Sequence, residues 1–277
     1  MRGQPEMEIN AMAGRLEGKV ALVTGAGAVG EGWGNGKATA VLFAREGASV
    51  FAVDIVAAAA EATRAIIEGE EGRCVAHTTD VTDGAQVEAM VAACLDAFGR
   101  IDILHNNVGG SAPGGPVEMS EDAWRAQMDH NLTHVFLALK HVLPVMERQG
   151  GGAVVNVSSQ AGLRYTGKFH AAYDAAKAGL IHLTRTLAVH YGPKGIRLNT
   201  VIPGSIHTPL VEHRLAKQYS GGDLKKMFAD DAATIPLRVR GEAWDVAFAA
   251  LYLASDEAKF VTATEILVDG GKTARCD

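Results

Sequence analysis

The chain has 277 residues, 48% of them hydrophobic, and a formal net charge of −6. This length and composition allow a large buried core, so we expect a soluble globular protein, and the negative charge excludes a basic surface for nucleic acid. No stretch reaches the roughly 20 apolar residues that cross a bilayer, and the first residues lack the apolar run of a signal peptide, which excludes a membrane location and predicts a cytoplasmic protein.

From Lys19 onward, short β-branched segments alternate with longer segments of helical period, a pattern typical of parallel strands joined by crossover helices. The expected strands cover 19–24, 49–54, 74–78, 101–105, 153–158, 196–202 and 265–268. The expected helices cover about 36–46, 56–68, 83–98, 120–148, 172–191 and 242–254. Several strands are almost continuously apolar, as strands covered on both faces are. The sequence predicts an α/β protein with a single-domain Rossmann fold, a doubly wound parallel sheet of about seven strands with helices on both faces.

Two segments fall outside this alternation. Residues 1–16 are expected to form a flexible N-terminal tail, followed by one domain over 17–277. Residues from about 204 to 240 contain no expected strand, and Gly221–Gly222 interrupts them. This segment predicts a mobile insertion with short helices, of the kind that often covers a substrate.

The first expected strand runs into a segment from Thr24 to Lys37 that contains six glycines. Within it, Gly25, Gly27 and Gly30 form a literal G-x-G-x-x-G directly after a strand, which is the context of a dinucleotide-binding turn. A helix that began at Gly30 would hold three further glycines in its first turns, each costing about 1 kcal/mol relative to alanine. A helix start near residues 35–37 is therefore favoured, and the literal motif is interpreted as a coincidence.

This later start predicts which groups meet the cofactor. Gly25 makes the tight turn, while Gly34, Asn35 and Gly36 bring backbone N–H groups to a pyrophosphate at the helix N-terminus. The residues between them form an enlarged loop. Trp33 lies in this loop. Its ring is expected either to pack beside the cofactor or over the active-site mouth, or to anchor the loop on the protein.

Asp54 closes the second expected strand, roughly 20 residues beyond the glycines. A carboxylate at this point accepts both hydroxyls of an adenosine ribose and repels a 2′-phosphate. The sequence therefore favours NAD over NADP. Lys37, at the helix start, is either a second phosphate contact or a solvated residue.

These and further motifs, in order along the chain, resemble the short-chain dehydrogenase/reductase family from about Glu17 to Gly271. They are the glycine segment, Asp80-Val81, N-N-x-G at Asn106 to Gly109, Asn131, Ser158-Ser159, Y-x-x-x-K at Tyr173 and Lys177, P-G-x-I-x-T at Pro203 to Thr208, and V-D-G-G at Val268 to Gly271. The chain departs from the usual pattern in its longer glycine loop, in Asn35 and Val108, and in Ser159, which lies one residue further from Tyr173 than is common.

The resemblance implies a catalytic set. Tyr173 and Lys177 share one face of a helix, and a neighbouring ammonium lowers the pKa of a phenol, which is otherwise near 10. The family pattern makes Tyr173 the general acid/base, and lets Lys177 also hold the nicotinamide ribose. It also implies that Ser159 hydrogen-bonds the substrate oxygen and that Asn131 supports a water path to Lys177.

The resemblance also implies further cofactor contacts and an assembly. The resemblance assigns Asp80 and Val81 to adenine, Asn107 and Gly109 to the adenosine side, and Ile206 and Thr208 to the nicotinamide carboxamide. Pro203 is a further expected cofactor contact. A homotetramer is implied, with the helix of Asn131, the helix of Tyr173 and the C-terminal strand at its interfaces.

The expected function is NAD-dependent interconversion of a small-molecule secondary alcohol and a ketone. The residues expected to line or approach the substrate pocket are Leu163, Tyr165, Phe169, His170, His207, Leu210 and His213. This mixed wall suits a cyclic or aromatic alcohol without selecting one. A 3-oxoacyl thioester reductase and a non-catalytic NAD-binding sensor remain alternatives.

Three rival functions have less support. His130, His134 and His141 fall at helical spacing, but no H-E-x-x-H or carboxylate set completes a metal site, so no metal is expected. Neither Ser158 nor Ser159 lies in the G-x-S-x-G of a serine hydrolase. Enoyl reductases of this family usually space their tyrosine and lysine more widely than this chain does. The cysteines, expected as free thiols, are Cys74, Cys94 and Cys276.

Overall fold

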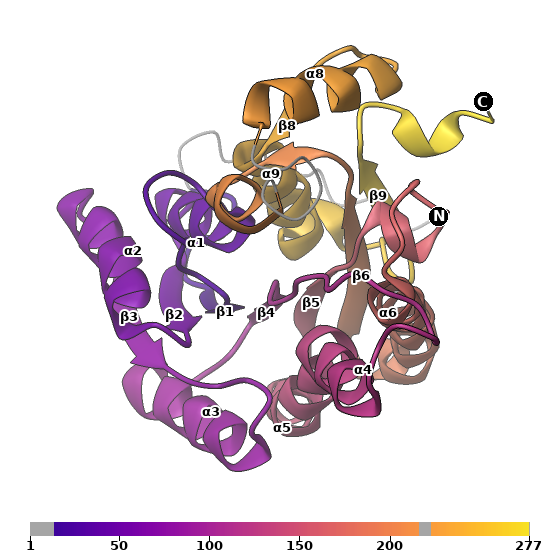
Figure 1. Ribbon diagram of the computed structural model, residues 1–277. Coiled ribbons are helices and arrows are strands. Elements are labelled where there is room, and N and C mark those ends of the chain that lie inside the picture. Colours follow the sequence, from indigo (N-terminus) through magenta and orange to yellow (C-terminus); the bar gives the residue numbers. More distant parts are fainter. Residues whose placement is uncertain (1–13, 216–222, 277) are drawn as a thin grey trace, which may run out of the picture.

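The computed structural model describes residues 14–215 and 223–276, in which seven parallel strands form one sheet. The strand order is β3-β2-β1-β4-β5-β6-β9 (Figure 1). The strands are β1 Val20–Thr24, β2 Ser49–Asp54, β3 Cys74–Thr78, β4 Ile103–Asn106, β5 Gly152–Val157, β6 Ile196–Pro203 and β9 Glu265–Val268. The order reverses between β1 and β4, and such a switch point opens a crevice outside the carboxyl ends of the strands. The predicted Rossmann fold is confirmed.

Helices cover both faces of this sheet (Figure 1). One face carries α1 Asn35–Arg45, α2 Ala57–Gly69 and α9 Ala243–Ala254. The other carries α3 Gly84–Phe98, α5 His134–Gln149 and α6 Ala171–Tyr191, with α4 Glu121–Met128 ahead of α5. Beyond the end of β6 lie β7 Ile206–His207, α8 Leu224–Thr234 and β8 Gly241–Glu242, and β7 pairs with β8 apart from the main sheet.

Alternate residues of a strand enter separate hydrophobic cores. In β1, Ala21 and Val23 pack in the core of α1 and α9, whereas Val20 and Leu22 pack in the core on the opposite face. Successive side chains of a strand point to opposite faces, so a strand covered on both faces must be apolar throughout. The continuous apolar runs of the sequence have this physical cause.

The long helix expected over 120–148 is interrupted. After α4 ends at Met128, Asp129–Thr133 form a π-helical turn, and α5 begins at His134. A single π-turn within a helix often lies at a functional site because it re-aims a side chain. Here it places Asn131, which is fully buried.

The predicted N-terminal boundary is wrong, because residues assigned to the tail belong to the fold. Leu16 is fully buried in the core of α1 and α9. Arg15 forms an ion pair with Glu257, with 2.6 Å between Nη2 and Oε2. Residues 1–13, the rest of the predicted tail, lie outside the described part of the chain.

The predicted insertion at about 204–240 does contain short elements. These are β7, a π-helical turn Val211–Leu215 and α8, while Gly221–Gly222 lies outside the described residues. Its mobility and its role over a substrate stay predictions. Across the described ranges, no helix is both long and apolar enough to cross a membrane.

Candidate functional site

A cavity of about 630 Å³ lies at the carboxyl ends of the parallel strands. Its wall includes every residue that the sequence predicted to contact the cofactor: Gly25, Gly34, Asn35, Gly36, Asp54, Asp80, Val81, Asn107, Gly109, Tyr173, Lys177, Pro203, Ile206 and Thr208. Ser159 also lines it, whereas Asn131 lies behind the wall. The sheet thus brings motifs from the whole length of the chain to one crevice.

The glycine segment has the predicted register at helix α1. The helix begins at Asn35 after the N-cap residue Gly34, and no side chain caps its first backbone N–H groups. A Cβ atom on Gly36 would lie 2.0 Å from the carbonyl oxygen of Gly25, so only glycine fits. The Oδ1 atom of Asn35 is buried and has no hydrogen-bond partner among the described residues. The uncapped N–H groups at the start of α1 can donate to a dinucleotide pyrophosphate, and the close packing of Gly36 on Gly25 is compatible with such a site.

Gly27, which the sequence interpretation treated as part of a coincidence, has a structural reason to be glycine. Its Cβ atom would lie 2.5 Å from the Cβ atom of Ala59, and its backbone N–H donates to Oδ2 of Asp54 at 3.0 Å. The other carboxylate oxygen of Asp54 accepts from the N–H of Val56 at 3.0 Å. Two backbone donors therefore hold this carboxylate in the cavity wall, with lone pairs left for a ligand.

Residues after β3 and β4 complete this end of the cavity. Asp80 accepts hydrogen bonds from the backbone N–H and the hydroxyl of Thr82, which shape the turn that places Val81 in the wall. Asn107 donates to the carbonyl oxygen of Gly25 at 3.1 Å. The sequence interpretation missed Thr79, a residue of the cavity wall. Its hydroxyl oxygen is buried and, within the described part of the chain, has no hydrogen-bond partner.

Tyr173 and Lys177 lie on one face of α6 at the other end of the cavity. The Lys177 ammonium is 5.9 Å from the centre of the Tyr173 ring and donates to the carbonyl oxygen of Val157 at 3.0 Å. Complete burial lowers the pKa of Lys177 to about 8. A cation thus lies beside the phenol in a site that disfavours charge, so it interacts more strongly with the phenol than it would in water.

The two serines after β5 have different partners. Ser158 is buried and donates to the carbonyl oxygen of Lys177 at 2.8 Å, which ties the strand end to α6. Ser159 accepts a hydrogen bond from the N–H of Ala161 at 3.2 Å, so its own O–H can still donate into the cavity. This difference favours Ser159 as the residue that faces a substrate oxygen.

Asn131 is held rigidly by the π-helical turn. Its Oδ1 atom accepts from the N–H of Gly110 at 3.0 Å, and its amide donates to the carbonyl oxygens of Gly110 and Gln127 at 3.0 and 2.9 Å. A Cβ atom on Gly109 would lie 2.9 Å from both Oδ1 of Asn131 and Nζ of Lys177. Both polar atoms therefore approach the same point beneath the cavity wall.

The predicted substrate wall is largely absent from the cavity. Of its members only Leu210 lines it, while Tyr165 and Phe169 are exposed. His170 is buried, with its ring centre 5.8 Å from that of Tyr173. The sequence interpretation missed several wall residues near this end, which are Ser111, His130, Pro209 and Val211.

Trp33 does not line the cavity. Its ring centre is 4.7 Å from that of Trp244 in α9, and the Lys37 ammonium lies 5.0 Å from its centre. These contacts support the anchoring of the loop on the protein, and a place for Trp33 beside the cofactor or over the active-site mouth stays a prediction. Lys37 donates to the carbonyl oxygen of Gly32, so it also helps to hold the loop in place.

The described residues include no group of three His, Cys, Asp or Glu side chains able to hold a metal ion. Of the three histidines at helical spacing, His134 is buried and its pKa is lowered to about 3, chiefly by burial and also by the charge of Lys177. Burial raises the pKa values of Cys74 and Cys94 to about 12, which makes both thiols poor nucleophiles.

Comparison with known proteins agrees with this geometry. Residues 29–273 match a family model described as "Enoyl-(Acyl carrier protein) reductase". Levodione reductase from Leifsonia aquatica is 39% identical over 263 residues, which cover 94% of this chain and 96% of that protein.

Two solved structures have the same fold. A protein from Burkholderia xenovorans assigned to the short-chain dehydrogenases/reductases has a TM-score of 0.92 and 52% identity, covering 96% of this chain and 100% of its own. A 7α-hydroxysteroid dehydrogenase in complex with NADH and 7-oxo glycochenodeoxycholic acid has a TM-score of 0.84 and 33% identity, covering 93% and 95% of the two chains.

Proposed function

Because the chain belongs to the short-chain dehydrogenase/reductase family, we propose that it is an NAD-dependent oxidoreductase that interconverts a secondary alcohol and a ketone. The observation that carries the proposal is one cavity with Asp54 at one end and the Tyr173–Lys177 pair, with Ser159, at the other. NAD, when bound, supplies a nicotinamide ring that exchanges a hydride with the carbinol carbon.

Tyr173 is the proposed general acid/base. During alcohol oxidation its phenolate oxygen takes the hydroxyl proton, and during ketone reduction it returns that proton to the carbonyl oxygen. Ser159 donates a hydrogen bond to the same substrate oxygen, because its O–H can still donate while its oxygen accepts from Ala161. The two groups together orient the substrate and stabilise the charge that develops on its oxygen.

Lys177 and Asn131 support this proton transfer. The buried ammonium of Lys177 favours the phenolate form of Tyr173, and its bond to Val157 fixes its position. Asn131, held by Gly110 and Gln127, keeps its Oδ1 atom close to Lys177, and the remaining lone pair of this oxygen can accept from the first water of a path. Asn131 is thus assigned a positioning role behind the site.

A mutational test separates catalysis from binding. Tyr173→Phe should lower kcat by a factor of about 10² or more, since general acid/base catalysis contributes about 10²–10⁴. NADH affinity, measured by fluorescence titration, should stay unchanged. Tyr191→Phe, at the far end of the same helix, is the matched control. Activity retained in Tyr173→Phe would remove Tyr173 from the role of general acid/base. The alternative of an NAD-binding sensor would be revived if the native protein binds NADH tightly but turns over none of the alcohols tested.

NAD is preferred over NADP in this proposal because the Asp54 carboxylate is fixed by Gly27 and Val56 at the adenosine end. A 2′-phosphate would meet this negative charge. Asp54→Asn keeps the size of the side chain and removes its charge together with one of its two acceptor oxygens. The ratio of kcat/KM for NADP⁺ to that for NAD⁺ should therefore rise about tenfold or more. An unchanged ratio would remove Asp54 from the assignment.

The substrate class is proposed as a cyclic alcohol or ketone. The 7α-hydroxysteroid dehydrogenase is named for a ring-system substrate. The cavity that includes Tyr173 has polar and apolar wall residues able to contact such a ring: Ser111, His130, Pro209, Leu210 and Val211. The runner-up is a 3-oxoacyl thioester, the substrate class in the name of the 3-oxoacyl-[acyl-carrier-protein] reductase FabG from Thermotoga maritima, which is 39% identical over 257 residues. A screen of NAD⁺ and NADP⁺ with cyclic alcohols, aryl alcohols, sugars and 3-hydroxyacyl thioesters distinguishes them.

We also propose a homotetramer in the cytoplasm. Large apolar side chains are exposed on the elements expected at the interfaces, which supports assembly. They are Trp124 and Phe136 beside the Asn131 turn, Val189 on α6, and Phe248, Phe260 and Leu267 around α9 and β9. Light scattering coupled to size-exclusion chromatography measures the mass directly, and a monomer would contradict this assignment.

A further inference from the structure

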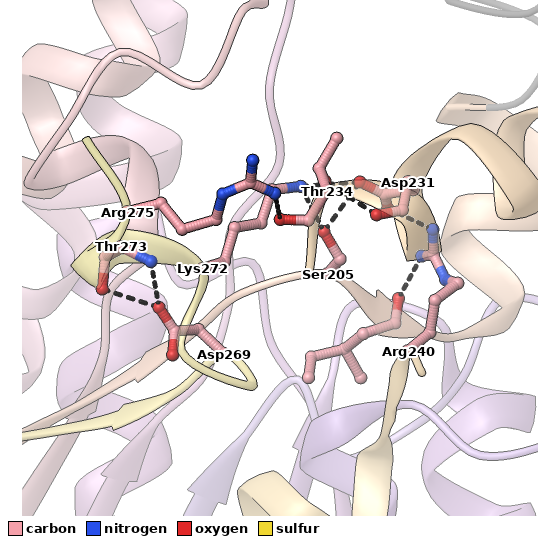
Figure 2. Close-up of polar contacts among 9 residues, drawn as sticks. Ser205, Asp231, Thr234, Arg240, Asp269, Lys272, Thr273 and Arg275 are labelled. Atoms are coloured by element: carbon pink, nitrogen blue, oxygen red, sulfur yellow. Dashed lines mark hydrogen bonds and ion pairs between the residues drawn. The ribbon is translucent and has the colours of Figure 1, made fainter. Parts of the chain in front are cut away.

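A cluster of polar and charged side chains joins the β6–β7 connection, the segment from α8 to β8 and the C-terminal segment (Figure 2). Asp231 of α8 accepts hydrogen bonds from Lys272 at 2.7 Å and from Ser205 at 3.0 Å, and it forms an ion pair with Arg240. Lys272 also donates to the Ser205 hydroxyl at 3.0 Å. One carboxylate thus holds the C-terminal segment, the β6–β7 connection and the residue before β8.

This cluster reaches the cavity through backbone groups. Ser205 lies between Gly204 and Ile206, which both line the cavity. Arg240 donates to the carbonyl oxygen of Ile206 at 3.0 Å, and the N–H of Gly241 donates to the carbonyl oxygen of Ser205 at 3.2 Å. A movement of Asp231 would therefore move the wall assigned to the nicotinamide end.

The V-D-G-G motif explains how Lys272 reaches Asp231. Asp269 accepts from the N–H of Gly271 at 2.8 Å and from the N–H and hydroxyl of Thr273 at 2.7 and 2.6 Å. Gly270 and Gly271 have φ values of 62° and 86°, which glycine adopts readily. Together they form a tight turn that presents the next residue, Lys272, to α8.

Electrostatics make Asp231 the centre of the cluster. The side chains of Asp231, Arg240 and Lys272 are 17%, 11% and 19% exposed, so water screens their charges weakly. Burial would raise the pKa of Asp231, but Lys272, Arg240 and Ser205 outweigh it and hold the pKa below its usual value. Lys168 is a third cation in range, with a pKa lowered first by burial and also by Lys272 and Arg240. Without the Asp231 carboxylate, three cations would repel one another.

We propose that Asp231 is a positioning residue: it docks the C-terminal turn on α8 and thereby fixes Ile206, and with it the cavity wall that receives the nicotinamide end of the cofactor. The inference rests on the proposed function for the identity of that ligand. According to this inference, the V-D-G-G turn and α8 act together to hold the cavity wall in place. Asp231 itself does not line the cavity.

The test compares Asp231→Asn with Asp230→Asn, its exposed neighbour on the same helix. The readouts are hydrogen–deuterium exchange of the β7 and β8 amides without nucleotide, and the Kd for NADH. Asp231→Asn should speed exchange and weaken NADH binding by about tenfold each, whereas Asp230→Asn should change neither. With an alcohol substrate, KM should rise more than kcat falls, because the general base is untouched. Asp231→Glu should recover most of the NADH affinity.

Equal exchange and equal NADH affinity in the two asparagine variants would overturn the inference. If Asp231→Asn does not fold, Lys272→Met tests the inference in its place. This variant removes the bond from the C-terminal turn to Asp231 and keeps the Asp231–Arg240 pair. Unchanged β7 exchange in Lys272→Met would then overturn it. If the native protein oxidises no alcohol, the proposed function fails, while amide exchange still decides the role of Asp231.

Discussion

Replacing Gly36 with alanine tests which glycines of the enlarged loop approach the cofactor. The added methyl would lie 2.0 Å from the carbonyl oxygen of Gly25 and 2.5 Å from the Nδ2 atom of Asn107. Ordinary C···O contacts are about 3.3–3.6 Å, so the turn and the start of α1 must separate by about 1 Å or more. This shift also disturbs the 3.1 Å hydrogen bond from Asn107 to Gly25.

The size of the effect follows from the hydrogen bonds that the shift would misalign. A hydrogen bond to a charged group contributes about 1.5–3 kcal/mol. Because the first N–H groups of α1 lack a side-chain cap, they are the expected pyrophosphate donors. Loss of one such bond would weaken NADH binding by about 10- to 100-fold, at 1.4 kcal/mol per factor of ten.

NADH fluorescence titration measures this effect, and thermal unfolding without nucleotide reports any loss of stability. Gly69→Ala is the control, since the added methyl meets no atom within 4 Å. Gly30→Ala is the discriminating variant, because its methyl would meet the flexible side chain of His213 at 2.7 Å. The register is refuted if Gly30→Ala abolishes NADH binding while Gly36→Ala preserves it.

Three further outcomes are expected. Trp33→Ala should lower stability by about 2 kcal/mol by removing its ring from α9, with NADH affinity unchanged by titration. Gly109→Ala should lower kcat about tenfold, because its methyl would lie 2.9 Å from Nζ of Lys177; steady-state assays measure this. His105 and His134 have pKa values lowered to about 3 by burial. The unfolded chain binds protons first as pH falls below about 6.5, so stability should drop by about 2 kcal/mol per histidine at about pH 5, and an unchanged urea midpoint would contradict this.

The fold could be predicted from the sequence because the pattern of apolar residues within each segment identifies its strands and helices. Alternate β1 residues enter two cores, so the apolar run identifies a strand covered on both faces, and the apolar period from Ala38 identifies where α1 begins. The candidate site followed for the same reason, since residues that end parallel strands meet at one edge of the sheet. Helical spacing predicts only that Tyr173 and Lys177 share one face of a helix, and their catalytic roles were inferred from the family resemblance.

The remaining features depend on partners that no local pattern specifies. Leu16 is an isolated leucine between Arg15 and Glu17, and only its burial under α1 and α9 makes it part of the core. The partner of Trp33, Trp244, lies on a helix near the other end of the chain. The residues expected to form the substrate wall depend on how loops turn, so Tyr165 and Phe169 are exposed.

The surplus glycines serve the conformation of the enlarged loop more than phosphate contact. Gly30 and Gly32 have φ values of 84° and 107°, which other residues rarely adopt. A Cβ atom on Gly32 would lie 3.2 Å from the side chain of Pro209, and one on Gly30 would meet His213. The loop therefore reaches across to the segment after β7, and both edges line the cavity. Its added length bridges the two sides of the crevice, whereas Gly34 and Gly36 keep the helix start open beneath it.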